Sequence, residues 1–173
     1  MIPVGAADVV ATTPAPAIGV LVIGYGNPLR SDDGLGPAVA AHLAGDPRLA
    51  GAEIRAEHQL VPELALDASR ATLLVLVDAV DGVPAGEVAV RRIDDATPVV
   101  VGADVSMTHH VGPDSLIGLA RELFGAAPPV VIVSVGAASF EVGERLTSAV
   151  EAAVPRAARA VIDAVVAAAA EGR

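Results

Sequence analysis

The sequence predicts a three-layer α/β/α sandwich built on a mostly parallel, twisted sheet of about five strands. The length of 173 residues suits one domain with a substantial core. Hydrophobic residues make up 53% of the chain but aromatic ones only 2%, so alanine and branched aliphatic side chains must fill that core. Short apolar runs also alternate with segments of helical spacing, which is typical of parallel strands covered by helices on both faces.

The first half of the chain contains three expected strands and two expected helices. Ile18–Gly24 is short, apolar and β-branched, as in a buried strand, and a glycine-rich turn separates it from helical spacing over Leu35–Leu43. Ala52–Glu57 alternates like a second strand. Pro62–Ala68 begins with a proline, which favours the first turn of a helix. Thr72–Val77 is again fully apolar and predicts a buried strand that ends before Asp78.

The second half predicts two more strands and two more helices. Glu87–Ile93 alternates and contains two arginines, which indicates an edge strand protected by charge. Pro113–Phe124 is expected to be a helix, and Val130–Val135 is the last buried strand. Leu146–Ala169 predicts a final amphipathic helix with a possible break at Pro155.

Charge and cysteine content narrow the possible functions. With 21 acidic and 11 basic residues the formal net charge is -10, so nucleic acids and anionic membranes are poor partners. A cation or a basic protein suits this surface better. The absence of cysteine excludes disulfides, thiolate metal sites and a cysteine nucleophile. Any metal must therefore be bound by His, Asp and Glu side chains, which favour borderline or hard divalent ions.

The N-terminal 17 residues contain neither Arg nor Lys and no sustained apolar run, so they do not resemble a signal peptide. We expect residues 1–17 to be a flexible tail and residues 18–173 to form a single catalytic domain. No stretch of about 18 apolar residues predicts a membrane span. A cytoplasmic location is the expectation.

Polar residues gather where predicted strands end, which is where open parallel sheets bind ligands. They are Asn27, Asp32 and Asp33 after the first strand, Asp78 and Asp81 after the third, and His109 and His110 in the irregular loop before the Pro113 helix. Two carboxylates and one imidazole would make a three-ligand site for a divalent metal with open positions.

The first turn superficially resembles a nucleotide-binding loop. Gly24 and Gly26 follow a strand, but Leu29 occupies the third glycine position and the aspartate pair would repel a pyrophosphate. We therefore expect no nucleotide cofactor. One of Asp32 and Asp33 is expected to cap the following helix, which leaves the other free to bind a cation.

The polar residues after the third strand and the histidine pair could also have purely structural roles. Asp78 could be a turn former, and Asp81 more so because Gly82 follows it. Neighbouring residues in extended backbone point in opposite directions, so only one of His109 and His110 is expected to join a shared site. The chain lacks both the H-E-x-x-H metalloprotease motif and the G-x-S-x-G nucleophile motif.

Taken together, these motifs resemble those of the hydrogenase maturation endopeptidases, the family that trims the large subunit of nickel-iron hydrogenases. The resemblance rests on G-Y-G-N-P-L-R-S-D-D-G-L-G from Gly24, on V-D-A-V-D-G from Val77, and on a histidine in the loop before a helix. It extends from Ile18 to about Pro155.

The resemblance implies an aspartic-type endopeptidase that removes the C-terminal peptide of a large-subunit precursor after nickel insertion. The nickel belongs to the substrate and is contacted transiently. By motif position, Asp33 and Asp78 are the catalytic, metal-contacting carboxylates. The histidine ligand is His109, favoured by its spacing to Gly112, with His110 as the alternative.

Substrate contacts are expected from Asn27, which could steady the developing oxyanion, and from His58 and Gln59. The latter two lie in an H-Q-L-x-P-E-L segment that resembles one branch of the family and replaces a D-G-G-T-type segment. Two other functions remain open from the sequence: a metallopeptidase or amidohydrolase with its own ion, and a non-catalytic metal-sensing chaperone.

Overall fold

The computed structural model describes residues 18–93 and 111–171. The predicted tail, the segment that contains His109 and His110, and the last two residues lie outside the described residues. No helix in the two described ranges has the length and apolar character needed to cross a membrane.

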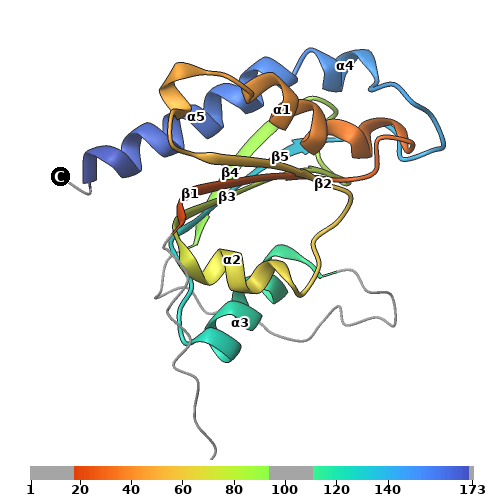
Figure 1. The fold of residues 1–173 in the computed structure, drawn as a ribbon. Coiled ribbons are helices and arrows are strands. Elements are labelled where there is room, and N and C mark those ends of the chain that lie inside the picture. Colours follow the sequence, from red (N-terminus) through yellow and green to blue (C-terminus); the bar gives the residue numbers. More distant parts are fainter. Residues whose placement is uncertain (1–17, 94–110, 172–173) are drawn as a thin grey trace, which may run out of the picture.

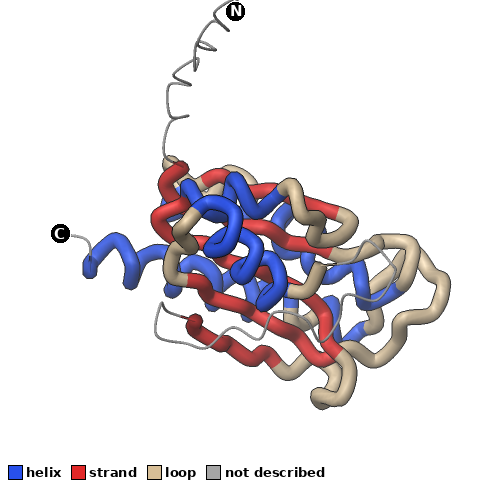
Figure 2. The backbone as a smooth tube through the Cα atoms, turned by 90° about the horizontal axis from the view of Figure 1, so that it is seen from below, coloured by secondary structure: helices blue, strands red, loops and turns tan. Residues whose placement is uncertain are grey.

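A five-stranded sheet forms the middle layer of the fold (Figure 1). Its strands are β1 (Ile18–Tyr25), β2 (Glu53–Glu57), β3 (Ala71–Val80), β4 (Val88–Ile93) and β5 (Val130–Gly136). They lie side by side in the order β2-β1-β3-β5-β4 (Figure 2). The first four strands in this order are parallel, and β4 pairs antiparallel with β5 at the edge. The mostly parallel sheet and its arginine-bearing edge strand are thus confirmed.

Helices cover both faces of the sheet and complete the predicted three layers (Figure 1). They are α1 (Leu35–Leu43), α2 (Leu64–Arg70), α3 (Pro113–Phe124), α4 (Ser148–Glu151) and α5 (Val154–Glu171), with short 3₁₀ turns at Ser31–Gly34 and Pro47–Leu49. The helices α1 and α5 pack on one face, and α2 and α3 pack on the other.

Two hydrophobic cores follow from the alternation of side chains along each strand. Val75 and Val77 of β3 point into the core under α1 and α5. Leu74, directly before Val75, and Leu76, between the two valines, point into the core with α2 and α3. Both faces of the central strands are therefore buried, which explains why those strands are apolar without interruption.

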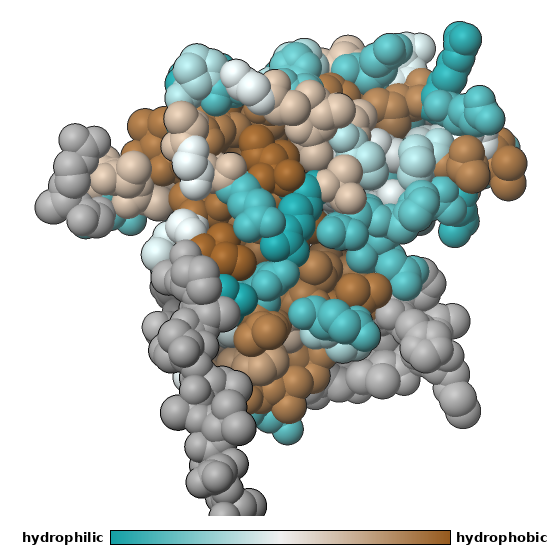
Figure 3. Space-filling model, viewed as in Figure 1, coloured by the Kyte–Doolittle hydropathy of each residue, from teal (hydrophilic) through white to brown (hydrophobic). Residues whose placement is uncertain are grey.

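The outer surfaces of the two helical layers differ in polarity. On the face shown in Figure 3, hydrophobic residues reach the surface of the lower layer, whereas hydrophilic residues are frequent along the upper one. Leu66 of α2 and Leu123 and Phe124 of α3 are among the exposed apolar side chains.

Two predicted boundaries were wrong, and one was confirmed. The third strand continues to Val80, so Asp78 lies inside it, because Asp78 and its neighbours still pair with β5. The second helix begins at Leu64 rather than Pro62, which forms a turn before it. The predicted break in the C-terminal helix is confirmed: α4 ends at Glu151, and Pro155 is the second residue of α5, where its missing N–H leaves no helical bond unmade.

The topology has a switch point at the carboxyl ends of β1 and β3. The helix α1, after β1, lies on one face, whereas α2, which leads into β3, lies on the other. The strand order therefore reverses between the neighbouring strands β1 and β3. In open α/β sheets, ligands bind at such a reversal, beyond the carboxyl ends of the strands.

Candidate active site

A row of three polar side chains crosses the carboxyl ends of β1, β3 and β5. The Tyr25 hydroxyl donates a hydrogen bond of 2.6 Å to Oδ2 of Asp78. The Ser134 hydroxyl donates one of 2.8 Å to Oδ1 of the same residue. Asp78 and Ser134 are also register partners in the sheet. Each carboxylate oxygen of Asp78 thus has its own hydroxyl donor from a neighbouring strand.

The surroundings of Asp78 favour its protonated form. Burial raises its pKa, and the negative charge of Asp33 raises it further. The two hydroxyl donors and the positive charge of Arg91 act in the opposite direction but do not cancel the rise. Asp78 is therefore a stronger base than a free aspartate, and Asp33 lies close enough to influence it.

The turn after β1 holds the second carboxylate. Asp33 is half-buried, and its Oδ2 accepts a hydrogen bond of 3.0 Å from the backbone nitrogen of Asn27. The side-chain oxygen of Asn27 accepts one from the Leu29 nitrogen at 2.9 Å. This turn is therefore held by its own backbone and side chains, as expected of a preformed binding loop.

Glycine permits this turn at Gly26, whose φ of +137° is unfavourable for other residues. A Cβ at Gly26 would collide with the Asp33 carbonyl. A Cβ at Gly36, in the first turn of α1, would collide with the backbone of Tyr25 and Val77. These glycines let the turn and α1 approach β1 and β3 closely, which explains the glycine content of the motif.

The expectation that one aspartate caps α1 was wrong. The N-cap of α1 is Gly34, and it makes no side-chain cap bond, because the aspartates belong to the preceding 3₁₀ turn. Asp32 is fully buried and accepts hydrogen bonds from the backbone nitrogens of Ala138, Ser139 and Thr147. It therefore connects the turn to the loop after β5.

The remaining predicted residues lie in different places. His58 is exposed and Gln59 half-buried directly after β2, where Gly26 of the first turn donates a backbone hydrogen bond to Glu57. Asp81 forms the predicted turn, since its carboxylate accepts from the Gly82 nitrogen at 2.8 Å.

His109 and His110 lie outside the described residues. In the described part of the chain, no three His, Cys, Asp or Glu side chains form a group able to hold a metal ion.

Two residues of the site were missed at the level of sequence. Tyr25 lies in the glycine-rich motif, which assigns it no role of its own, and Ser134 lies outside any nucleophile motif. A signal was present, since Ser134 is the only polar residue in its strand and shares its register row with Asp78. Strand pairing, which reveals that relation, is not visible in the sequence.

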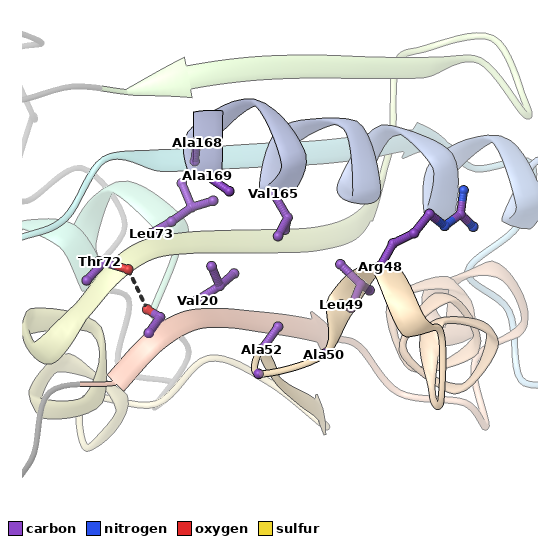
Figure 4. A pocket seen from close by; sticks show the side chains of 12 residues that line it. Val20, Arg48, Leu49, Ala50, Ala52, Thr72, Leu73, Val165, Ala168 and Ala169 are labelled. Atoms are coloured by element: carbon purple, nitrogen blue, oxygen red, sulfur yellow. Dashed lines mark hydrogen bonds between the residues drawn. The ribbon is translucent and has the colours of Figure 1, made fainter. Parts of the chain in front are cut away.

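A cavity of about 560 Å³ lies at the opposite end of the strands, away from Asp33 and Asp78 (Figure 4). It is bordered by the amino ends of β1 and β3, by Leu49 and by Val165 of α5. Thr72 there donates a hydrogen bond to the Gly19 carbonyl rather than pointing a free polar group into the space. The cavity is thus separate from the aspartates and contributes nothing to their site.

Several solved structures with the same fold are maturation proteases of hydrogenases. Hydrogenase 2 maturation peptidase from a Thaumarchaeota archaeon superposes with a TM-score of 0.63 and 27% identity, over 84% of this chain and 97% of that one. The hydrogenase maturating endopeptidase HybD from Escherichia coli gives 0.64 and 26%, over 84% and 91%. An endopeptidase from Escherichia coli gives 0.67 and 26%, over 88% and 93%.

The chain shares the fold of hydrogenase maturation proteases, in agreement with the family resemblance of its motifs. It is accordingly a peptide hydrolase, as the motifs of the first turn and of β3 predict. No protein-family model matches the sequence, and no curated protein matches it. The similarity covers nearly the whole of each structural neighbour, so it extends to the domain as a unit rather than to one motif.

Proposed function

We propose that this chain is the endopeptidase that removes the C-terminal peptide of a nickel-iron hydrogenase large-subunit precursor after nickel has been inserted. The neighbours named hydrogenase maturation peptidases support the reaction and the kind of substrate. That they are named as proteases specific to hydrogenases favours this function over a general metallopeptidase and over a non-catalytic chaperone.

One observation carries the proposal: two carboxylates, Asp33 and Asp78, lie at the carboxyl ends of neighbouring strands, close enough for the charge of Asp33 to raise the pKa of Asp78. Each is held by neutral donors, namely a backbone N–H for Asp33 and two hydroxyls for Asp78. Such a pair has a net negative charge and is attractive to a cation. The nickel of the precursor supplies that cation.

The third contact to nickel is assigned to His109. Val111, two residues later, donates a backbone hydrogen bond to Leu60 and packs into the core beneath α2 and α3. Asp78 follows Leu74 and Leu76 at a spacing of two and so belongs to the same face of the sheet. Imidazole is a ligand that suits nickel.

Hydrolysis requires a water molecule that is activated near the scissile peptide bond. Nickel in the substrate can polarise the carbonyl or the water, and Asp78, a stronger base than a free aspartate because burial raises its pKa, can accept the proton. The side-chain amide nitrogen of Asn27 is the donor that can stabilise the oxyanion, because the backbone N–H groups of Gly26, Asn27 and Leu29 already donate within the protein.

The deciding experiment incubates the purified chain with nickel-loaded and nickel-free precursor and reads the precursor's C-terminus by mass spectrometry. Cleavage of the nickel-loaded form alone is expected, and Asp33→Asn should abolish it. Asp163→Asn is a matched control, because Asp163 is an exposed aspartate of α5 paired with Arg159. Cleavage that ignores nickel, or that survives Asp33→Asn, would overturn the proposed mechanism.

A further inference from the structure

We infer that Tyr25 and Ser134 are positioning residues that orient the Asp78 carboxylate toward the nickel of the substrate. The inference rests on the proposed function and extends it to two residues that do not themselves contact the metal. Its basis is the pair of hydroxyl hydrogen bonds, of 2.6 Å and 2.8 Å, that reach the two oxygens of Asp78.

These two bonds hold the carboxylate from opposite neighbours. Tyr25 belongs to β1 and Ser134 to β5, the strands on either side of β3. All three strands pair in parallel register, so their backbones cannot shift independently. Rotation of the Asp78 carboxylate would break both hydrogen bonds, and the orientation of the group is therefore set before any substrate arrives.

The chemistry of the donors suits a ligand for a cation. The hydroxyl groups of tyrosine and serine both keep their protons at neutral pH and carry no charge. They fix the carboxylate without neutralising it, whereas an arginine in either place would compete with the metal. Outer partners of this kind commonly orient the side chains that bind a metal.

Tyr25 also relates the two carboxylates to each other. Its side chain holds Asp78, and the backbone nitrogen of Asn27, two residues later, holds Asp33. One short stretch of chain at the end of β1 therefore makes hydrogen bonds to both carboxylates. The Tyr25 hydroxyl itself contacts only Asp78, so Tyr25→Phe should disturb that carboxylate and leave the contact between Asn27 and Asp33 in place.

A purely structural role is the competing explanation, since a buried carboxylate needs hydrogen-bond partners for stability. The two explanations predict different effects on the preference of the enzyme for nickel-loaded over nickel-free precursor. Loss of a merely structural bond lowers the free energy of unfolding and leaves the preference unchanged. Loss of an orienting bond weakens binding of nickel-loaded precursor much more than binding of the nickel-free form.

The test measures kcat/KM for cleavage and the affinities for nickel-loaded and nickel-free precursor. The variants are Tyr25→Phe, Ser134→Ala and Ser134→Thr, and the last of these keeps the hydroxyl. Thr72→Val is the control, because it removes a hydroxyl at the amino end of β3, far from Asp78 along the strand. Urea unfolding of each variant confirms the fold.

Tyr25→Phe and Ser134→Ala should each lower the ratio of the two affinities by roughly 10- to 100-fold, in line with other outer partners of metal ligands. Ser134→Thr should restore most of it, and Thr72→Val should match the wild type. In an Asp78→Asn background the Tyr25→Phe change should have no further effect, since the tyrosine acts through Asp78.

An unchanged affinity ratio in both hydroxyl-deleted variants overturns the inference, and so does an equal loss in the Asp78→Asn background. If Tyr25→Phe unfolds, the comparison of Ser134→Ala with Ser134→Thr decides. A wild-type chain that does not prefer or cleave nickel-loaded precursor refutes the proposed function itself, and the positioning role falls with it.

Discussion

Thr147 donates two hydrogen bonds to Asp32, from its backbone nitrogen to Oδ1 at 2.6 Å and from its hydroxyl to Oδ2 at 2.9 Å. The two residues are 115 positions apart in the chain. Asp32 also accepts from the nitrogens of Ala138 and Ser139, at 2.8 Å and 3.0 Å. A single buried carboxylate thus fastens the loop between β5 and α4 to the turn that contains Asp33.

Asp32→Asn should destabilise the fold by roughly 2–4 kcal/mol, because the amide retains one acceptor and places a donor against other donors. Chemical denaturation at pH 7 measures the loss. Asp163→Asn, at an exposed ion pair, should change the free energy of unfolding by no more than about 0.5 kcal/mol. Equal stability of the two variants would refute the fastening role of Asp32.

The Asp32 contribution should depend on pH. Burial alone would raise the pKa of Asp32, but the combined hydrogen bonds from Thr147, Ala138 and Ser139 lower it below the ordinary value. A depressed pKa in the folded state stabilises the protein above the unfolded value of about 3.9. The gap between wild type and Asp32→Asn should therefore be constant near neutrality and shrink as the pH falls below about 4.

Asp78→Asn should abolish cleavage of nickel-loaded precursor without destabilising the chain. Loss of a general acid–base group costs roughly 10²- to 10⁴-fold in rate. Because the pKa of Asp78 is raised by burial, its ionised form at pH 7 opposes folding. The free energy of unfolding of Asp78→Asn at pH 7 should equal or exceed that of the wild type.

That stability relation also has a defined pH range. The penalty is fully present above the folded pKa of Asp78 and disappears below its unfolded pKa of about 3.9. Any stability advantage of Asp78→Asn should therefore vanish on acidification. A large loss of stability at pH 7 would show instead that the carboxylate is needed for folding.

His109→Ala should abolish cleavage, whereas His110→Ala should leave most of it, because the spacing to Gly112 favours His109 as the ligand. Mass spectrometry of the precursor after incubation with each variant distinguishes them. The reverse result would transfer the ligand role to His110. Full activity of both variants would remove histidine from the site.

Gln59→Ala and His58→Ala should raise KM for the precursor and leave kcat nearly unchanged, which is the signature of lost substrate binding. Both residues follow β2, whose last residue accepts a hydrogen bond from Gly26 of the Asp33 turn. Steady-state cleavage of nickel-loaded precursor measures both constants. A fall in kcat with constant KM would place these residues in the chemical step.

Most of the fold was predictable because local pattern and burial agree. Ile18–Gly24, Thr72–Val77 and Val130–Val135 are apolar on both faces, and each lies in a central strand covered by helices on both sides. The ends of the strands and helices were harder to predict. The strand that contains Asp78 continues three residues beyond its apolar run, since pairing with β5 compensates for the polar side chain.

The sequence by itself determined the α/β class, the family resemblance and the candidates Asp33 and Asp78, because these depend on local spacing and on motifs. Only the tertiary structure decided which groups hold them. Asp32, expected to share the capping and binding roles with Asp33, fastens a loop more than 100 residues away. The hydroxyls of Tyr25 and Ser134 reach Asp78 across strands far apart in the chain. Such hydrogen bonds depend on strand register and loop closure, which arise only when the whole sheet assembles.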